Sequence, residues 1–183
     1  MDKMPHIASL VIVLSIAAAL GTAEVRSEEA VTPQGLTEIA AFRLESHLGH
    51  RTLLLAEAIP AESYEWRPAE GIRSVAELFR HMASSYYWFG VQLGADKPAD
   101  VPNWDQVESK EEILEALAGS IAFARQAILS QTEEELDREI DFFGRPTTQG
   151  ELVLNLMTHG SEHLGQAIAY ARSVGVEPPW SDG

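Results

Sequence analysis

Helical periodicity in four long stretches is the feature that most constrains how this chain can fold. Apolar residues spaced three and four positions apart run through residues 36–58, 74–93, 109–128 and 148–175. Such spacing places them on one face of an α-helix, and that face is stable in water only when it is buried against another element. Four amphipathic helices with almost no strand pattern therefore predict an all-α fold, a four-helix bundle.

The helix boundaries carry their own signals. Three of the four stretches open with a capping box, in which a serine or threonine is followed three residues later by glutamate, at Ser74, Ser109 and Thr148. Prolines beyond the first and last stretches, at Pro60 and Pro178, are typical of helix ends. These signals place the helix ends to within a few residues.

The connections between the helices are long. Each has about a dozen residues or more, whereas helix–helix turns in bundles need roughly two to eight. The last connection adds a helical turn at 132–136 and a short extended piece at 140–143, which Gly144 closes before Pro146 ends the connection. We therefore expect long crossover connections, which allow consecutive helices to be non-neighbours.

An apolar run near the N-terminus predicts a secretory signal peptide. Lys3 precedes the run from Ile7 to Leu20, and Gly21-Thr22-Ala23 offers small residues at the cleavage positions. The run is shorter than the ~20 residues that span a bilayer as a helix, and without cysteine the chain cannot be a lipoprotein. We expect a cleaved signal peptide at 1–23, a loose arm at 24–35 and one bundle domain at 36–183. The mature protein would be periplasmic or secreted, without a stable membrane anchor.

Charge and composition exclude several classes of function. The formal net charge of -15 argues against binding to nucleic acid or to anionic lipid, because both need clustered Lys and Arg. Because the chain has no cysteine, it has no disulfide, no thiol nucleophile and no thiolate metal ligand. A metal site in this protein would be built from His, Asp, Glu and water.

Three histidines are candidates for such a site. His159 and His163 are four residues apart in the last helical stretch. Side chains at that spacing lie about 5–6 Å apart and point the same way, so they can hold one metal ion together with a third ligand. His81, beside the apolar stripe of the second stretch, is the candidate third ligand. Spacing alone leaves open that all three are structural residues without a metal.

Two other metal-site patterns fit poorly. None of the six histidines follows a glutamate by three positions, which argues against the di-iron sites of some bundles. His159-Gly160-Ser161-Glu162-His163 matches the inverted zinc-protease pattern, but the only glutamate downstream of it is Glu177, within the tail.

Several blocks of this sequence resemble the DinB/YfiT-like family. The first consists of Trp66 to Gly71, then Ser74 to Leu78, and then His81. The second is His159-x-x-x-His163-x-Gly165-Gln166. The remaining matches are Gly144, Thr148, Glu151-Leu152, Tyr170-Ala171-Arg172, Gly175 and Pro178-Pro179. The resemblance covers about residues 36–181.

The resemblance implies a four-helix bundle with long crossovers, often a homodimer, that holds a divalent metal ion (zinc, nickel, iron or manganese). The implied ligands are His81, His159 and His163. Some members are transferases or isomerases that use low-molecular-weight thiols. One departure is visible, because the family often has arginine where this chain has Leu164. Export is also less usual in the family.

Three functions follow as hypotheses. The first is a metal-dependent transferase or hydrolase of a small-molecule substrate, in which the metal activates a bound water or small thiol. The second is a bundle that binds metal or ligand without turnover, and the third is a structural bundle. No catalytic side chain is predicted. Candidate partners of the ligands are Glu77, Glu162 and Gln166, and His47 and Asn155 are candidates for lining a pocket.

Overall fold

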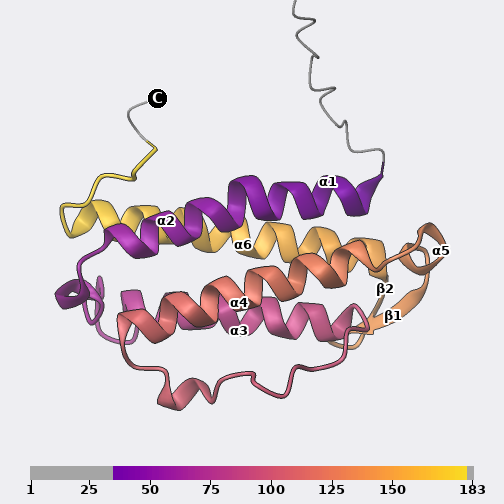
Figure 1. Cartoon of the computed structure of the whole chain (residues 1–183), viewed down its shortest axis with the longest axis horizontal. Helices are drawn as coiled ribbons and strands as arrows, with labels where there is room; N and C mark the ends of the chain where they lie inside the picture. The colour runs from indigo at the N-terminus through magenta and orange to yellow at the C-terminus, as the bar shows by residue number, and fades with distance from the viewer. Residues whose placement is uncertain (1–34, 181–183) are drawn as a thin grey trace, which may run out of the picture. The chain divides into compact units, whose positions relative to one another are not determined.

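The computed structural model describes residues 35–180, which form an all-α bundle as predicted (Figure 1). The first long helix consists of α1 (Leu36–Arg43), the π-helical segment η1 (Leu44–Gly49) and α2 (His50–Ala58). The other long helices are α3 (Val75–Gln92), α4 (Lys110–Leu129) and α6 (Gln149–Ser173). Each helix predicted from the apolar spacing is therefore confirmed.

The predicted signal peptide (1–23) and all but the last residue of the predicted arm (24–35) lie outside the described residues. Within residues 35–180, no helix has both the length and the apolar character needed to cross a membrane.

The predicted capping boxes are confirmed at two helices and half formed at the third. Ser74 and Ser109 cap α3 and α4 with both hydrogen bonds of the box. The Thr148 hydroxyl accepts from the amide of Glu151, but the Glu151 carboxylate accepts from the Thr147 hydroxyl instead of reaching back to the cap. A full capping box also opens the short helix α5 (Glu133–Leu136).

A β-hairpin replaces the single extended piece expected before the last helix. Strand β1 (Glu139–Phe142) pairs antiparallel with β2 (Arg145–Thr148), and Phe143 and Gly144 form the turn. Pro146 does not end the connection but lies inside β2 opposite Asp141. The two-stranded sheet allows this, because each strand has an open edge at which no N–H is needed.

The long crossovers set which helices are neighbours. α3 packs against α4 and α6, and the first long helix packs against the same two. Figure 1 shows the connection after α3 returning along the bundle, so that α3 and α4 run in the same direction. Residues with 0% exposure fill the core between them: Leu44, Leu55, Leu78, Phe79, Ile113, Leu117, Leu152 and Leu156.

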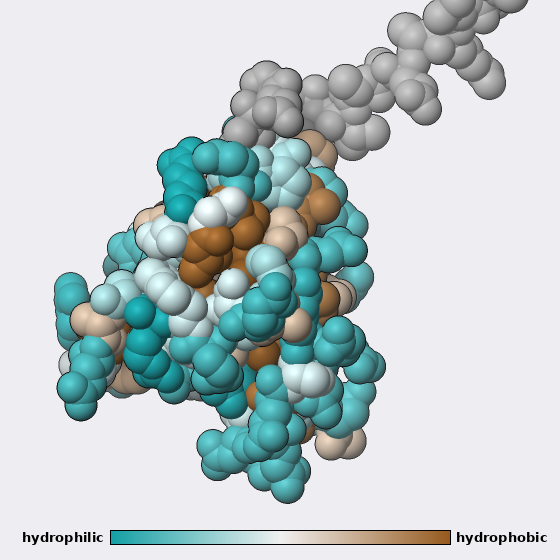
Figure 2. All heavy atoms as spheres, turned by 90° about the vertical axis from the view of Figure 1, so that its left-hand side faces the viewer, coloured by the Kyte–Doolittle hydropathy of each residue, from teal (hydrophilic) through white to brown (hydrophobic). Residues whose placement is uncertain are grey.

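Most of the molecular surface that Figure 2 shows is polar, in keeping with the acidic composition. On the face shown in Figure 2, hydrophilic residues cover most of the surface and hydrophobic ones gather near its upper centre.

Candidate metal centre

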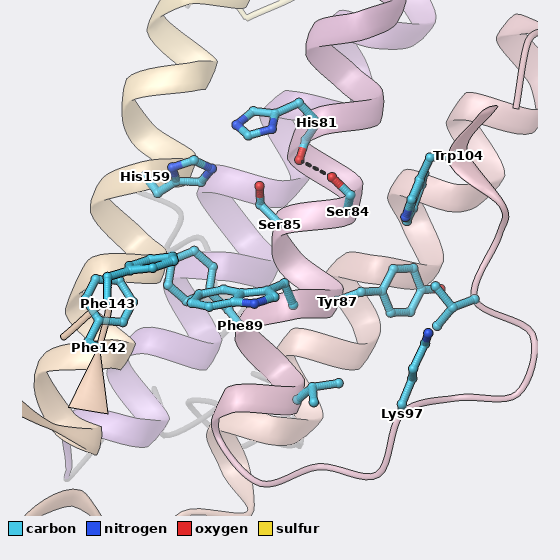
Figure 3. A pocket seen from close by; sticks show the side chains of 13 residues that line it. His81, Ser84, Ser85, Tyr87, Phe89, Lys97, Trp104, Phe142, Phe143 and His159 are labelled. Carbon is cyan, nitrogen blue, oxygen red and sulfur yellow. Dashed lines mark hydrogen bonds between the residues drawn. The ribbon is translucent and has the colours of Figure 1, made fainter. Parts of the chain in front are cut away.

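The three candidate histidines lie together between α3 and α6. His81 Nε2 lies 3.1 Å from His163 Nε2, and one ring nitrogen from each of the three histidines falls within 4.8 Å of the others. The centroid of the His159 ring is 5.2 Å from that of His81 and 4.5 Å from that of His163. Figure 3 shows His81 and His159 directed toward one another from the two helices. Two helices thus bring together residues that are far apart in the sequence, and their ligation of a metal stays a prediction.

A glycine allows the two helices to approach this closely. Gly160 follows His159 on α6, and a Cβ there would lie 2.5 Å from the Tyr86 hydroxyl and 2.8 Å from Leu48 Cδ2. Both distances are shorter than any van der Waals contact of carbon, so only glycine fits without displacing a neighbour. Tyr86 belongs to α3 and is 1% exposed, which leaves it little room to move.

The environment favours the neutral form of His81 and His159 by lowering the pKa of both. Burial, the Arg73 charge and the two neighbouring histidines lower the pKa of His81 to about 4. Burial and His163 also lower the pKa of His159, with Arg73 adding to the effect and the Glu162 charge opposing it. Neutral imidazoles carry the lone pairs that bind metal ions, so near pH 7 few protons compete for these nitrogens.

Gln166, one of the three candidate partners named from the sequence, contacts the His163 ring. Its Oε1 lies 3.0 Å from His163 Nδ1, and its Nε2 donates to the Tyr170 hydroxyl at 2.8 Å. The Tyr170 ring in turn packs edge-on against Trp66, with 5.3 Å between centroids. His163 therefore donates through Nδ1 and presents the lone pair of Nε2 to its neighbours, which is the arrangement typical of metal-binding histidines.

The other predicted partners serve elsewhere. Glu77 caps α3 through Ser74 and pairs with Arg67 at 3.1 Å, so its carboxylate is already used. Glu162 is exposed, and so is His47 on η1, while Asn155 is half-buried and does not line the groove described below. Leu164 is 7% exposed and belongs to the hydrophobic core.

One buried atom indicates that the cluster fits a metal ion. His159 Nε2 is inaccessible to solvent and has no hydrogen-bond partner. Buried polar atoms are rarely left unpaired, because losing water without a replacement costs about 1–3 kcal/mol. A divalent cation between the three rings would satisfy this nitrogen and separate the facing nitrogens of His81 and His163. Three imidazoles suit zinc, nickel or iron and leave coordination positions open.

A groove of about 670 Å³ adjoins the cluster, and sequence analysis did not predict it. His81 and His159 belong to its lining, which is otherwise mostly apolar and aromatic. The further lining residues are Ser84, Ser85, Tyr87, Trp88, Phe89, Val91, Lys97, Val101, Trp104, Phe142 and Phe143. One signal was available: Trp88 lies outside the apolar stripe expected for the core, yet it follows His81 by seven positions and so shares its helix face.

Comparisons with known proteins agree with this architecture. The model of the DinB family matches residues 42–183. The protein YjoA of Bacillus subtilis (strain 168), described as uncharacterized, is 36% identical over 140 residues, which are 73% of this chain and 90% of YjoA.

Two solved structures have the same fold. The crystal structure of the DinB-like protein YjoA from Bacillus subtilis matches with a TM-score of 0.58 and 28% identity, covering 75% of this chain and 96% of that one. A DinB-like protein from Bacillus cereus ATCC 10987 has a TM-score of 0.61 and 20% identity, covering 76% of this chain and 93% of that one. The family resemblance and the bundle fold expected from the sequence are thereby confirmed.

Proposed function

This chain belongs to the DinB family, and from that premise we propose that it is an exported metalloenzyme with one divalent ion held by His81, His159 and His163. The observation that carries the proposal is the convergence of three ring nitrogens within 4.8 Å, one of them buried without a partner. When bound, the ion supplies Lewis acidity and lowers the pKa of a water or small thiol at an open position.

The chain's own residues prepare the site for this chemistry. Gln166, held by Tyr170, keeps His163 in one tautomer, and burial keeps the pKa of His81 and His159 low. Because the protein has no cysteine thiol, the nucleophile in this proposal comes from outside, as a water or a low-molecular-weight thiol. The adjoining groove would hold the small-molecule electrophile beside the cluster, so that binding brings the reactants together.

A second candidate is a bundle that binds metal or ligand without turnover. Among the residues that line the groove there is no Asp or Glu that could act as a general acid or base. This observation favours binding alone when no external nucleophile takes part.

The metal site is tested by metal analysis of the purified mature protein. Wild type should carry about one divalent ion per chain, and His81→Ala should lose most of it, because two imidazoles rarely hold an ion. His50→Ala is the matched control, since His50 lies exposed on α2, and it should retain the metal. Full retention in His81→Ala would contradict the proposed ligand set.

Activity is tested with small thiols and activated electrophiles, alongside simple esters and amides. Thiol-dependent turnover would indicate a transferase, and ester or amide cleavage a hydrolase. Either rate should disappear in His163→Ala. If the metal-loaded protein turns over none of these substrates yet binds small molecules tightly, the binding bundle is the correct function.

Export has its own test, motivated by the apolar run at 7–20 and the small residues at 21–23. The intact mass of protein recovered from its native host should lack residues 1–23. A soluble cytoplasmic pool that keeps these residues would rule the proposal out.

A further inference from the structure

The groove beside the histidines follows one face of α3 (Figure 3). Ser84, Ser85 and Trp88 follow His81 by three, four and seven positions, so all four side chains share that face. The tip of the β-hairpin forms one wall with Phe142 and Phe143, and the connection after α3 contributes Lys97 and Trp104 to the other. The histidine cluster thus lies at one end of an apolar groove whose volume is typical of small-molecule sites.

Aromatic rings dominate the hairpin side of the groove. Trp88 and Phe143 are stacked, with 5.4 Å between centroids and 10° between planes. Phe142 packs edge-on against Phe143, with 4.8 Å between centroids. Trp88 is 37% exposed and Phe143 is 80% exposed, so this stack presents flat apolar surface to solvent. Such a surface favours stacking with a planar ring.

The backbone of Phe143 supports a role in binding. Its φ is 53°, in the left-handed region that costs a residue with a side chain about 1–2 kcal/mol. Asn, Asp and Gly are preferred in such two-residue hairpin turns, because they tolerate positive φ. The conformation of the turn therefore does not explain why a bulky and mostly exposed phenylalanine stands here. Its ring does complete the aromatic wall of the groove.

One cationic side chain belongs to the lining of the groove. Among its lining residues, all of which are in the described part of the chain, Lys97 is the only Lys, Arg, Asp or Glu. In Figure 3 its side chain lies at the end of the groove opposite His81 and His159. A ligand with an anionic substituent would be attracted to that end, although the chain as a whole has a formal net charge of -15.

We propose that this groove binds a planar aromatic molecule with an anionic substituent, its ring stacked on the wall of Trp88 and Phe143 and its anion beside Lys97. The inference rests on the proposed function in that it names the substrate class for the same site. The bound ring would extend from Lys97 toward the histidine cluster, so that the reacting substituent is the one opposite the anion.

The test is titration calorimetry with 2-naphthoate and its neutral isostere 2-naphthamide. Wild type should bind both, and 2-naphthoate about two- to fivefold more tightly, as an exposed ion pair allows. Phe143→Asn should weaken both by about five- to tenfold, because a stacking partner is lost. Its melting temperature should change little, because the better tolerance of asparagine for the positive φ offsets the lost packing on Trp88 and Phe142. Phe42→Ala, which removes a 56% exposed ring outside the groove, is the control and should leave both affinities unchanged.

Lys97→Ala should remove the preference for 2-naphthoate and leave the affinity for 2-naphthamide unchanged. If the preference survives Lys97→Ala but disappears when a chelator strips the metal, the carboxylate contacts the metal and the proposed orientation is wrong. If Phe143→Asn binds both probes as wild type does, the aromatic wall is not a ligand site. A change in its sedimentation would then indicate that the wall is a subunit interface.

Failure of this inference and failure of the metal proposal can be told apart. Wild type that carries no metal but binds 2-naphthamide, with the expected loss in Phe143→Asn, would overturn the metal site and support the groove. Wild type that carries about one ion per chain but binds neither probe would overturn the groove and leave the metal site standing.

Discussion

The histidine cluster and the aromatic groove share α3 but are built in different ways. The cluster takes its three side chains from two long, packed helices, and two of them are four residues apart on α6. The groove takes its walls from a hairpin turn and a long connection. Regular helices hold the first arrangement, and a strained turn holds part of the second. The cluster should therefore be sensitive to helix packing, and the groove to the conformation of its loops.

The largest expected effect comes from overpacking beneath the cluster. Gly160→Ala would place a Cβ 2.5 Å from the hydroxyl of buried Tyr86, so α6 must shift away from α3. We expect a loss of about 3 kcal/mol of unfolding free energy and weaker metal binding. Chemical denaturation and metal titration measure these effects.

Gly165→Ala on the same helix is the control. A Cβ there meets nothing within 4 Å, so alanine should stabilise the helix by about 0.5–1 kcal/mol and leave metal binding unchanged. Adding Tyr86→Phe to Gly160→Ala should recover part of the loss, since the Tyr86 hydroxyl has no hydrogen-bond partner. Equal effects of the two glycine substitutions would contradict the close-approach argument.

A second substitution should weaken metal binding by the cluster without destabilising the bundle. Gln166→Ala removes the acceptor of His163 Nδ1 and frees the ring to rotate. Loss of such a partner typically costs about 10–100-fold in metal affinity. The melting temperature of the metal-free protein should change little, because Gln166 is half-buried on the surface of α6. Unchanged metal affinity would show that Gln166 does not orient the ring.

A third change acts on the groove alone. Gly144 has a φ of 79° and nothing within 4 Å of a Cβ, so Gly144→Ala strains the turn without a clash. The cost should be about 1 kcal/mol, concentrated in the hairpin. The affinity for 2-naphthamide should fall while metal content stays that of wild type. If Gly144→Ala lowers the metal content as much as the affinity for 2-naphthamide, the cluster and the groove are not independent.

The smallest expected effect is on the stability of the fold and involves neither the histidine cluster nor the groove. A hydrogen bond from the Ser74 backbone, together with Arg67, holds the pKa of Glu77 below its usual 4.5, although burial opposes this. The stability that this adds is present above pH 4.5 and is lost as the pH falls through the folded-state pKa. Glu77→Gln should therefore cost a few tenths of a kcal/mol at pH 7 and nothing near pH 3, since the side chain of Glu77 is 38% exposed and solvent screens its interactions. A stability difference that does not vary with pH would contradict this account.

The same contrast explains what the sequence could predict. Helical spacing is local, so the four long helices and the His159–His163 pair followed from it. Two of the three expected capping boxes form with both hydrogen bonds. In the third, the Glu151 carboxylate accepts from the Thr147 hydroxyl instead, because the hairpin places Thr147 beside it. The sequence did not predict the hairpin for two reasons. Proline at position 146 usually ends a strand, and phenylalanine is uncommon at a turn position with positive φ, such as Phe143. The groove was missed because its walls meet only through tertiary packing.

The π-helical segment η1 could not be predicted from the 3.6-residue period of an α-helix either. A π turn contains one residue more than an α turn, so Leu44–Gly49 accommodates an extra residue while α1 and α2 keep their buried faces on the core. The segment therefore has the form of a single-residue insertion absorbed inside a helix. An alignment of relatives should place a one-residue gap between positions 44 and 49 rather than in a neighbouring loop, and a chain shortened there by one residue should keep its first helix as a continuous α-helix.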